Sequence, residues 1–207
     1  LKVGERARLS RRELALKLER HRDVTRVDAR FLDAHAGDLV VYAPSAQRIV
    51  DLVSTEGKFE SSPVTGTTAA ILKIQDLALA QGRFFTADET LRGETVAVIG
   101  SEVAKGAFPT GRALGRTLRI GGRAFRVVGV QEALGQLGGQ SQDRYVWIPL
   151  PAFERVFGIP QTLQIYAKSL VPGETVHAED RARASLRARR NLFPGRPDNF
   201  DIVTPDA

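Results

Sequence analysis

The sequence has no cysteine and no methionine among its 207 residues. Without cysteine it cannot form disulfide bonds, cysteine-ligated zinc sites or thiol nucleophiles. Methionine is missing even from position 1, which is Leu1, so we expect the chain to be processed or cut from a longer product. Long apolar runs are missing too. The longest, 39–43 and 145–150, have the length of strands and fall short of the roughly 20 residues that a membrane-spanning helix needs. No targeting segment is visible at the start.

The formal net charge is +6, and arginine carries nearly all of it. A nucleic-acid-binding track would gather these arginines on one face with aromatic residues between them, whereas here they are spread along the chain. A basic nucleic-acid-binding domain stays open as an alternative on charge alone. One local cluster exists, and its spacing favours the solvated face of a helix over a phosphate track: Arg181, Arg183, Arg187, Arg189 and Arg190.

Metal-binding and phosphate-binding patterns are absent from the sequence. No pair among His21, His35 and His177 has metal-ligand spacing, and the acidic residues beside His177 are typical of a helix start. The Gly57-Lys58 pair lacks the upstream glycine and the following Ser or Thr of a nucleotide triphosphate loop. The glycines at 135, 138 and 139 do not lead from a strand into a helix, as a dinucleotide-binding fingerprint requires.

A hydrolase built around Ser101 is a further alternative, because this serine follows a predicted strand and precedes a predicted helix. A nucleophile elbow needs glycine two residues to either side, and those positions hold Ile99 and Val103. Ser101 is therefore expected to be a helix N-cap. The carboxylate pairs 88/89 and 198/201 are typical of surfaces and turns. The sequence thus predicts a chain that is not an enzyme, with no catalytic, cofactor-binding or metal-binding residues, and it assigns no partner-binding residue.

Hydrophobic periodicity and turn signals predict alternating helices and strands. Helices are expected at 11–21, 68–74, 101–108, 151–157 and 174–190. Strands are expected at 31–32, 39–42, 49–53, 95–99, 117–120, 124–130, 144–148, 163–167 and 200–203. Turns are expected at Pro44-Ser45 and at Gly121-Gly122, and the latter predicts a hairpin.

Two segments between these elements read as loops. Residues 54–63 are polar and loop-like. Residues 131–142 are rich in Gly and Gln, and we expect a mobile loop or hinge there, with a loop of no role as an equal alternative. This order predicts an α+β fold whose two ends pair across an inserted middle.

Five blocks in sequence order resemble one family. The two most specific are 82–85 (Gly-Arg-Phe-Phe) and the strand 127–130 (Val-Val-Gly-Val). The other three are 64–68, 96–100 and 143–150. Together they are similar to the MacB-like periplasmic core domain of ABC-transporter permeases of the MacB/FtsX-like family. The resemblance covers roughly residues 9–204. Departures are Ala69 in place of a common proline, and Ala-Leu-Gly at 113–115 in place of Pro-Val-Gly.

The resemblance implies a split porter-like βα subdomain, residues 1–64 plus 143–207, with an inserted smaller mixed α/β (Sabre-like) subdomain at 65–142. It implies an extracytoplasmic module of a membrane-bound permease that relays ATP-driven conformational change to an outside partner, with efflux favoured. Release of lipoproteins and regulation of cell-wall hydrolases are alternatives within the same superfamily. The implied partners are the flanking transmembrane helices, an ATP-binding domain or subunit, a second permease copy and an extracytoplasmic adaptor protein. No cofactor and no nucleic acid are implied.

Overall fold

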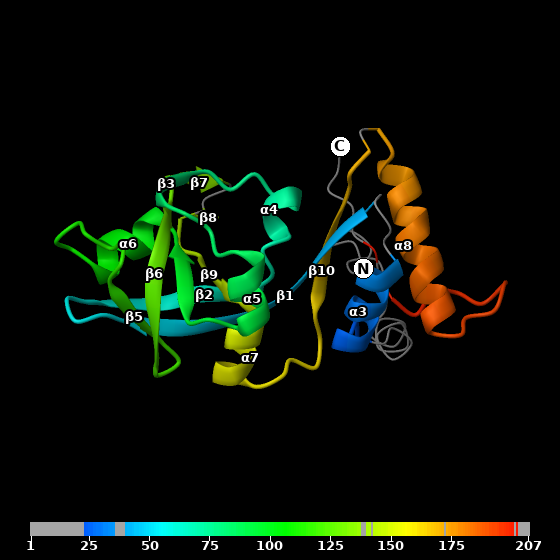
Figure 1. Ribbon diagram of the computed structural model, residues 1–207, viewed down its shortest axis with the longest axis horizontal. Coiled ribbons are helices and arrows are strands. Elements are labelled where there is room, and N and C mark those ends of the chain that lie inside the picture. The colour runs from blue at the N-terminus through cyan, green and yellow to red at the C-terminus, as the bar shows by residue number, and fades with distance from the viewer. Residues whose placement is uncertain are drawn as a thin grey trace, which may run out of the picture. The chain divides into compact units, whose positions relative to one another are not determined.

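A computed structural model of the chain describes residues 23–35, 40–137, 140–141, 143–171, 173–200 and 202. The helix predicted at 11–21 lies outside these residues. The described chain is a mixture of helices and strands, as expected (Figure 1). Among the helices that the structure describes, none combines the length and the apolar character needed to cross a bilayer.

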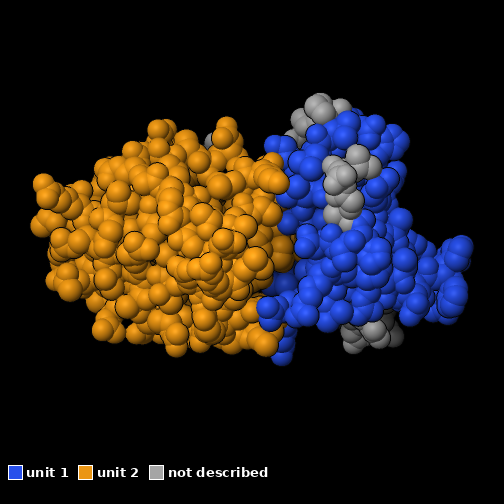
Figure 2. All heavy atoms as spheres, in the orientation of Figure 1, with its two compact units in different colours: residues 1–42, 161–163, 167–207 blue, residues 43–160, 164–166 orange. Residues whose placement is uncertain are grey.

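The chain divides into two compact units (Figure 2). Unit 1 comprises residues 1–42, 161–163 and 167–207, and unit 2 comprises 43–160 and 164–166. The boundaries predicted at 64/65 and 142/143 both fall inside unit 2. There β9 (Val146–Pro149) pairs with β2 (Lys58–Thr67) and with β4 (Val96–Ile99), so segments assigned to different subdomains share one sheet. The porter-like and Sabre-like assignments stay a prediction.

Six strands of unit 2 form a closed hydrogen-bonded ring. Starting from β1 (Val40–Val53), the ring runs through β2, β9 and β4 to β6 (Arg123–Gln131) and β5 (Thr117–Ile120). The pairing of β5 with β1, which places Leu52 opposite Ile120, closes it. The larger apolar side chains on these strands that no solvent reaches form the core of unit 2: Leu52, Val64, Ile99, Leu118, Ile120, Phe125, Val127, Val146 and Ile148.

The pattern of each strand explains its place in this ring. All four residues of β4 and of β9 are buried, so both read as continuous apolar runs. In β5 exposed and buried residues alternate, because one face meets solvent. The hairpin predicted between β5 and β6 is confirmed, and both turn glycines, Gly121 (φ 54°) and Gly122 (φ 81°), have the left-handed backbone that a tight hairpin turn requires.

Unit 2 also contains short helices and further strands. The strand β3 (Leu79–Gly82) pairs with β6. The helices are α4 (Ile71–Ile74), α5 (Ala87–Arg92), α6 (Ser101–Ala107) and α7 (Leu150–Phe157). Helix α7 packs on β2 at Gly66, where a Cβ atom would lie only 2.4 Å from the Cβ of Phe153. The close packing of α7 therefore depends on glycine at this position.

In the part of unit 1 that the structure describes, helices α3 (Arg26–His35) and α8 (Thr175–Arg189) pack together. Strand β10 (Gln164–Ser169) lies next to β1 in the sheet, and both strands run through both units. The buried apolar side chains of unit 1 are Ala29, Leu32, Val40, Tyr42, Leu163, Ala182, Leu186 and Phe200.

The predicted strand at 31–32 is wrong, because these residues lie in α3. The helix starts with a reciprocal cap between Thr25 and Asp28. The Thr25 amide donates to the Asp28 carboxylate at 3.0 Å, and the Asp28 amide contacts the Thr25 hydroxyl at 3.4 Å. Ala29 and Leu32, three residues apart, then share the buried face. Periodicity of a helix rather than of a strand explains this segment.

Two predicted interruptions of the sheet are also wrong. Pro44-Ser45 does not form a turn but lies within β1, where the Pro44 carbonyl and the Ser45 hydroxyl both bond the Thr67 hydroxyl, at 3.2 and 2.7 Å. The polar segment 54–63 is mostly strand, because a tight turn centred on Ser54 leads directly into β2. Of the predicted closing strand 200–203, the structure describes residues 200 and 202, and neither lies in a strand.

Candidate functional site

The histidines that the structure describes lie at the surface. His35 is exposed and stacks on Phe31 at 3.9 Å between ring centroids, with its Nδ1 atom 2.8 Å from the Phe31 carbonyl oxygen. His177 is exposed on α8. His21 lies outside the described residues. In the part of the chain that the structure describes, no three His, Asp or Glu side chains are grouped so that they could hold a metal ion.

Ser101 is the first residue of α6 and not its N-cap, which corrects the prediction. The N-cap is Gly100, whose amide donates to the Tyr145 carbonyl at 2.8 Å. A side chain cannot be placed at this position, because a Cβ on Gly100 would lie 2.2 Å from the Asp143 carbonyl oxygen. The close approach of two chain segments therefore decides which residue caps this helix.

The Gly/Gln-rich segment 131–142 contains two short paired strands, β7 (Gln136–Leu137) and β8 (Gln140–Ser141). The buried carboxylate of Asp143 accepts hydrogen bonds from the amides of Leu134 (2.7 Å) and Gly135 (3.1 Å), and the Ser141 hydroxyl donates to Glu102 on α6 at 2.6 Å. These bonds hold both ends of the segment to the body of unit 2. A hinge function for this segment stays a prediction.

The two segments that carry the strongest family resemblance lie side by side. Gly82 of β3 is paired with Gly129 of β6. A Cβ on Gly82 (φ 74°) would lie 2.2 Å from the Val128 carbonyl oxygen, and one on Gly129 would lie 2.3 Å from the Arg83 carbonyl oxygen. Both glycines are required because the two backbones approach too closely for side chains. Phe84 and Phe85 then enter the core, at 6% and 1% exposure.

Arg83 of the same segment pairs with Glu89, the carboxylate at 88/89 that was expected to be a simple surface group. Both terminal nitrogens of Arg83 bond Glu89 at 2.7 Å. Glu89 is buried and also accepts from the Thr86 amide at 2.8 Å, completing the capping box of α5. The hydrogen bonds from Arg83, followed by that from the Thr86 amide, outweigh burial and lower the pKa of Glu89 to about 2.

Substitution of Glu89 with Gln should therefore destabilise unit 2 in a pH-dependent manner. The lowered pKa means that ionised Glu89 stabilises the fold above its ordinary value of 4.5, and this contribution is lost as the pH falls from 4.5 towards 2. We expect a loss of about 1–2 kcal/mol at neutral pH, discounted because Arg83 is half-exposed, and almost none near pH 2. Urea unfolding of both proteins across this range measures the difference, and a pH-independent difference would contradict the assignment.

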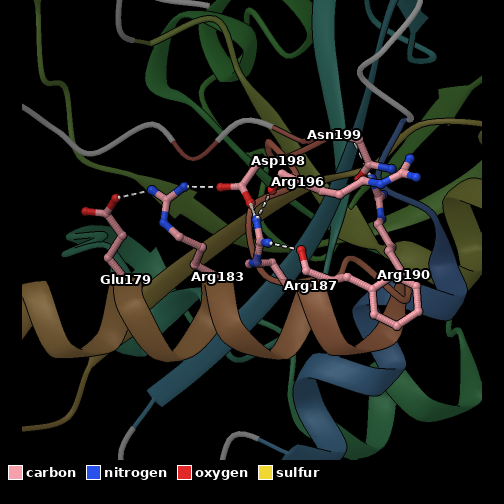
Figure 3. A network of polar contacts seen from close by, with 8 residues as sticks. Glu179, Arg183, Arg187, Arg190, Arg196, Asp198 and Asn199 are labelled. Carbon is pink, nitrogen blue, oxygen red and sulfur yellow. Dashed lines mark hydrogen bonds and ion pairs between the residues drawn. The ribbon is translucent and has the colours of Figure 1, made fainter.

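Unit 1 holds a second network, which centres on the arginine cluster of α8 (Figure 3). Arg183, Arg187 and Arg190 recur at helical spacing and point towards the returning chain segment 193–199. Asp198 accepts from Arg183 and, at 2.6 Å, from Arg187. Arg183 also pairs with Glu179 at 2.7 Å, and Arg187 donates to the Phe193 and Arg196 carbonyls. The segment after α8 is thereby held against the helix.

A capping motif at the end of α8 directs this return. Asn191 adopts a left-handed backbone (φ 51°), its amide donates to Ala188, and the Leu192 amide donates to Arg187 at 2.9 Å. These two bonds are those of a Schellman motif, in which the chain reverses after the last helical turn. The reversal brings residues 193–199 back along the arginine face of the helix.

Arg190 is the most buried member of the network. Its side chain and that of Asp28 are each 8% exposed, and Nη2 of Arg190 lies 2.9 Å from Asp28. The prediction of a solvated arginine face is thus wrong for Arg190, which is buried, whereas Arg183 and Arg187 pair with Asp198 and keep 38% and 24% of their side chains exposed. Sequence reasoning missed Asp28 and Asn199. The capping-box spacing of Thr25 and Asp28 could have identified the start of α3, but nothing local in the sequence indicates the Arg190 contact.

Comparison with known proteins identifies the family. The sequence profile of the MacB-like periplasmic core domain matches residues 5–186. The chain belongs to the MacB-like periplasmic core domain family. The close pairing of Gly82 with Gly129 joins the two segments on which the predicted resemblance to this family depended most.

Relatives of this chain include longer proteins that are named for export. It is 32% identical over 143 residues to the macrolide export ATP-binding/permease protein MacB of Chlorobium phaeobacteroides, covering 69% of this chain and 22% of the relative. It is 36% identical over 138 residues to the protein of the same name from Rhodospirillum rubrum, covering 65% and 21%. The chain therefore spans about a fifth of the length of these relatives.

Two solved structures of transporter domains share the fold. The periplasmic region of MacB from Actinobacillus actinomycetemcomitans superposes with a TM-score of 0.69 at 21% identity, covering 82% of this chain and 76% of that one. The extracellular domain of the noncanonic ABC-type transporter YknZ from Gram-positive bacteria gives 0.67 at 17% identity, covering 82% and 85%. At this identity, the similarity is one of fold.

Proposed function

We propose that this chain is the extracytoplasmic domain of a MacB-like ABC-transporter permease, and that it relays ATP-driven conformational change to an extracytoplasmic partner during export. The observation that carries the proposal is the match of residues 5–186 to the MacB-like periplasmic core domain. Export is supported by relatives whose names describe macrolide export. The proposed partners are the flanking transmembrane helices, an ATP-binding domain or subunit, a second permease copy and an adaptor protein.

A relay domain needs parts that move as stiff bodies and needs no reactive side chain. The closed ring of unit 2 supplies such a body, because each of its six strands is hydrogen-bonded on both sides. In unit 1 the arginine network holds the two helices and the segment after α8 together. ATP hydrolysis is assigned to the ATP-binding part of the permease and not to this chain.

Excision of residues 23–202 from the permease, with a Gly/Ser linker in their place, tests this function. We expect the variant to retain ATP hydrolysis and to lose export of a macrolide by roughly 5- to 150-fold, the usual range of coupling between distant sites. Hydrolysis and export are measured on the same reconstituted protein. Export at the wild-type level would exclude a relay function.

A matched control keeps the domain intact. Leu91 is 81% exposed on α5, and Leu91→Ala should leave both activities unchanged.

The side of the membrane on which the domain lies is tested separately. Phe193 is 71% exposed in a chain without cysteine, so Phe193→Cys offers one site within this domain for a membrane-impermeant maleimide. Labelling in intact cells whose outer membrane is permeabilised supports the extracytoplasmic location, and labelling only after lysis contradicts it.

A further inference from the structure

The guanidinium of Arg190 has two arms that bond two different segments of unit 1. Its Nη2 atom donates to the Asp28 carboxylate at 2.9 Å and to the Asp23 carbonyl at 3.1 Å, at the start of α3. Its Nη1 atom donates to the backbone carbonyl and the side-chain oxygen of Asn199, at 3.0 and 3.1 Å. One side chain therefore joins segments that lie 171 residues or more apart, since 199 − 28 = 171.

The surroundings of Arg190 keep this geometry in place. The residue caps the C-terminus of α8, so its backbone is set by the helix and by the reversal at Asn191. Its guanidinium carbon lies 5.6 Å from the ring centroid of Phe200, which is buried. A guanidinium is planar and holds its two terminal nitrogens at a constant separation, so movement of one bonded segment acts directly on the other.

We infer that Arg190 couples residues 23–28 to residues 198–200, so that a displacement of either segment is transmitted to the other through one buried guanidinium. In the proposed function, Arg190 would transmit a displacement of one of these segments to the other. The use of the coupling in a permease rests on the proposed function, whereas the coupling itself is a property of the 207-residue chain.

Amide hydrogen exchange of the chain, followed by NMR, tests the coupling by perturbing one segment and observing the other. The probe is the Ala29 amide, which bonds the Thr25 carbonyl at 3.0 Å in the first turn of α3. Asn199→Ala removes one contact of the Nη1 arm and does not alter α3. We expect it to raise exchange at Ala29 by roughly two- to tenfold, the range typical of residues in one network.

Asn199→Ala in an Arg190→Lys background distinguishes coupling through Arg190 from a general destabilisation of unit 1. Lysine keeps the charge near Asp28, but its ammonium lacks the two separated nitrogens with which the guanidinium reaches Asn199 and Asp28 at once. Asn199→Ala should then have no effect at Ala29. An unchanged Ala29 amide in the Arg190 background, or an equal increase in both backgrounds, would overturn the inference.

Two controls and one independent measurement complete the test. Arg189→Gln, next along the helix, should not change exchange at Ala29, and the Ala104 amide of α6 in unit 2 should be unaffected by every variant. If Arg190→Lys loses the protection of α8 altogether, Asp28→Asn and Asn199→Ala are combined with Arg190 intact. The equilibrium constant of unfolding of the double variant should then differ by roughly two- to tenfold from the value expected if the two effects were independent. Strict additivity would contradict the coupling. None of these results depends on export, so failure of the proposed function would remain distinguishable.

Discussion

Replacing Arg190 with methionine is expected to lower the free energy of unfolding of unit 1 by about 3–5 kcal/mol, the usual cost of removing one partner of a buried ion pair. The Asp28 carboxylate, whose side chain is 8% exposed beside Arg190, would lose the ion pair that the described residues give it, and the hydrogen bonds to Asp23 and Asn199 would be lost as well. Urea unfolding followed by circular dichroism and by exchange of the α3 amides measures the loss. A loss below about 1 kcal/mol, the level of a surface ion pair, would show that the pair is not buried in solution.

The pH dependence of this loss has a defined sign. Burial raises the pKa of Asp28, but the hydrogen bonds from Arg190 and Thr25 outweigh it and leave the pKa below its ordinary value of 3.8. In the native protein, ionised Asp28 therefore stabilises the fold above pH 3.8, and this contribution falls as the carboxylate is protonated. Without Arg190, the effect of burial on Asp28 dominates. Protonation of the Asp28 carboxylate would then reduce the destabilisation of the variant. The difference in free energy of unfolding between the native protein and the Arg190→Met variant should therefore shrink below about pH 4.

Neighbouring and compensating variants make the result specific. Arg189→Gln should cost less than about 0.5 kcal/mol, as a surface substitution does. Asp28→Asn combined with Arg190→Met should recover part of the loss, because no buried charge then remains unpaired. A double variant as unstable as Arg190→Met alone would attribute the effect to packing instead of charge.

Substituting Gly82 with alanine is expected to be the most damaging small change in unit 2. The left-handed backbone at this position costs a non-glycine residue about 1–2 kcal/mol. The new Cβ would also lie 2.2 Å from the Val128 carbonyl oxygen and 3.1 Å from the Gly129 Cα, which forces β3 away from β6 at a further cost of about 1–3 kcal/mol. Unfolding in urea, followed through Trp147 of the adjoining core, measures the sum.

Gly111 provides a matched control for this substitution. It has a similar backbone (φ 84°) in the same unit, but a Cβ there would meet no atom within 4 Å. Gly111→Ala should therefore cost only the backbone penalty of about 1–2 kcal/mol. The difference between the two alanine variants isolates the steric overlap between β3 and β6. Equal losses would mean that the two strands separate without cost, and that the family signature is not explained by their close approach.

Local elements were predicted well where neighbouring residues decide them. The turn at Gly121-Gly122, the apolar run of β4 and the helix after Gly100 follow from backbone preferences and short-range patterns, and the structure confirms them. The strand proposed at 31–32 failed because two apolar residues cannot distinguish a strand from one turn of a helix. The loop proposed at 54–63 failed because polar residues are tolerated on strand β2 wherever its side chains face solvent.

The contacts that matter most for the candidate site could not be read from local sequence. Asp28 and Arg190 are 162 residues apart in the chain, and Gly82 and Gly129 are separated by 47 (129 − 82). The helical spacing of Arg183, Arg187 and Arg190 indicated that they share a face, but that face was expected to meet solvent. Which side of a helix is buried depends on what the rest of the chain places against it.

The sequence by itself determined the family of this protein, most of its local elements and the lack of cysteine chemistry, because residue order and backbone preference act over a few positions. Tertiary structure alone decided that six strands close into a ring, that Gly82 and Gly129 are opposed, and that a single arginine bonds both Asp28 and Asn199. Those features depend on close approach and burial between distant segments. Glycine is required only where two backbones meet, and an ion pair is strong only where water is excluded.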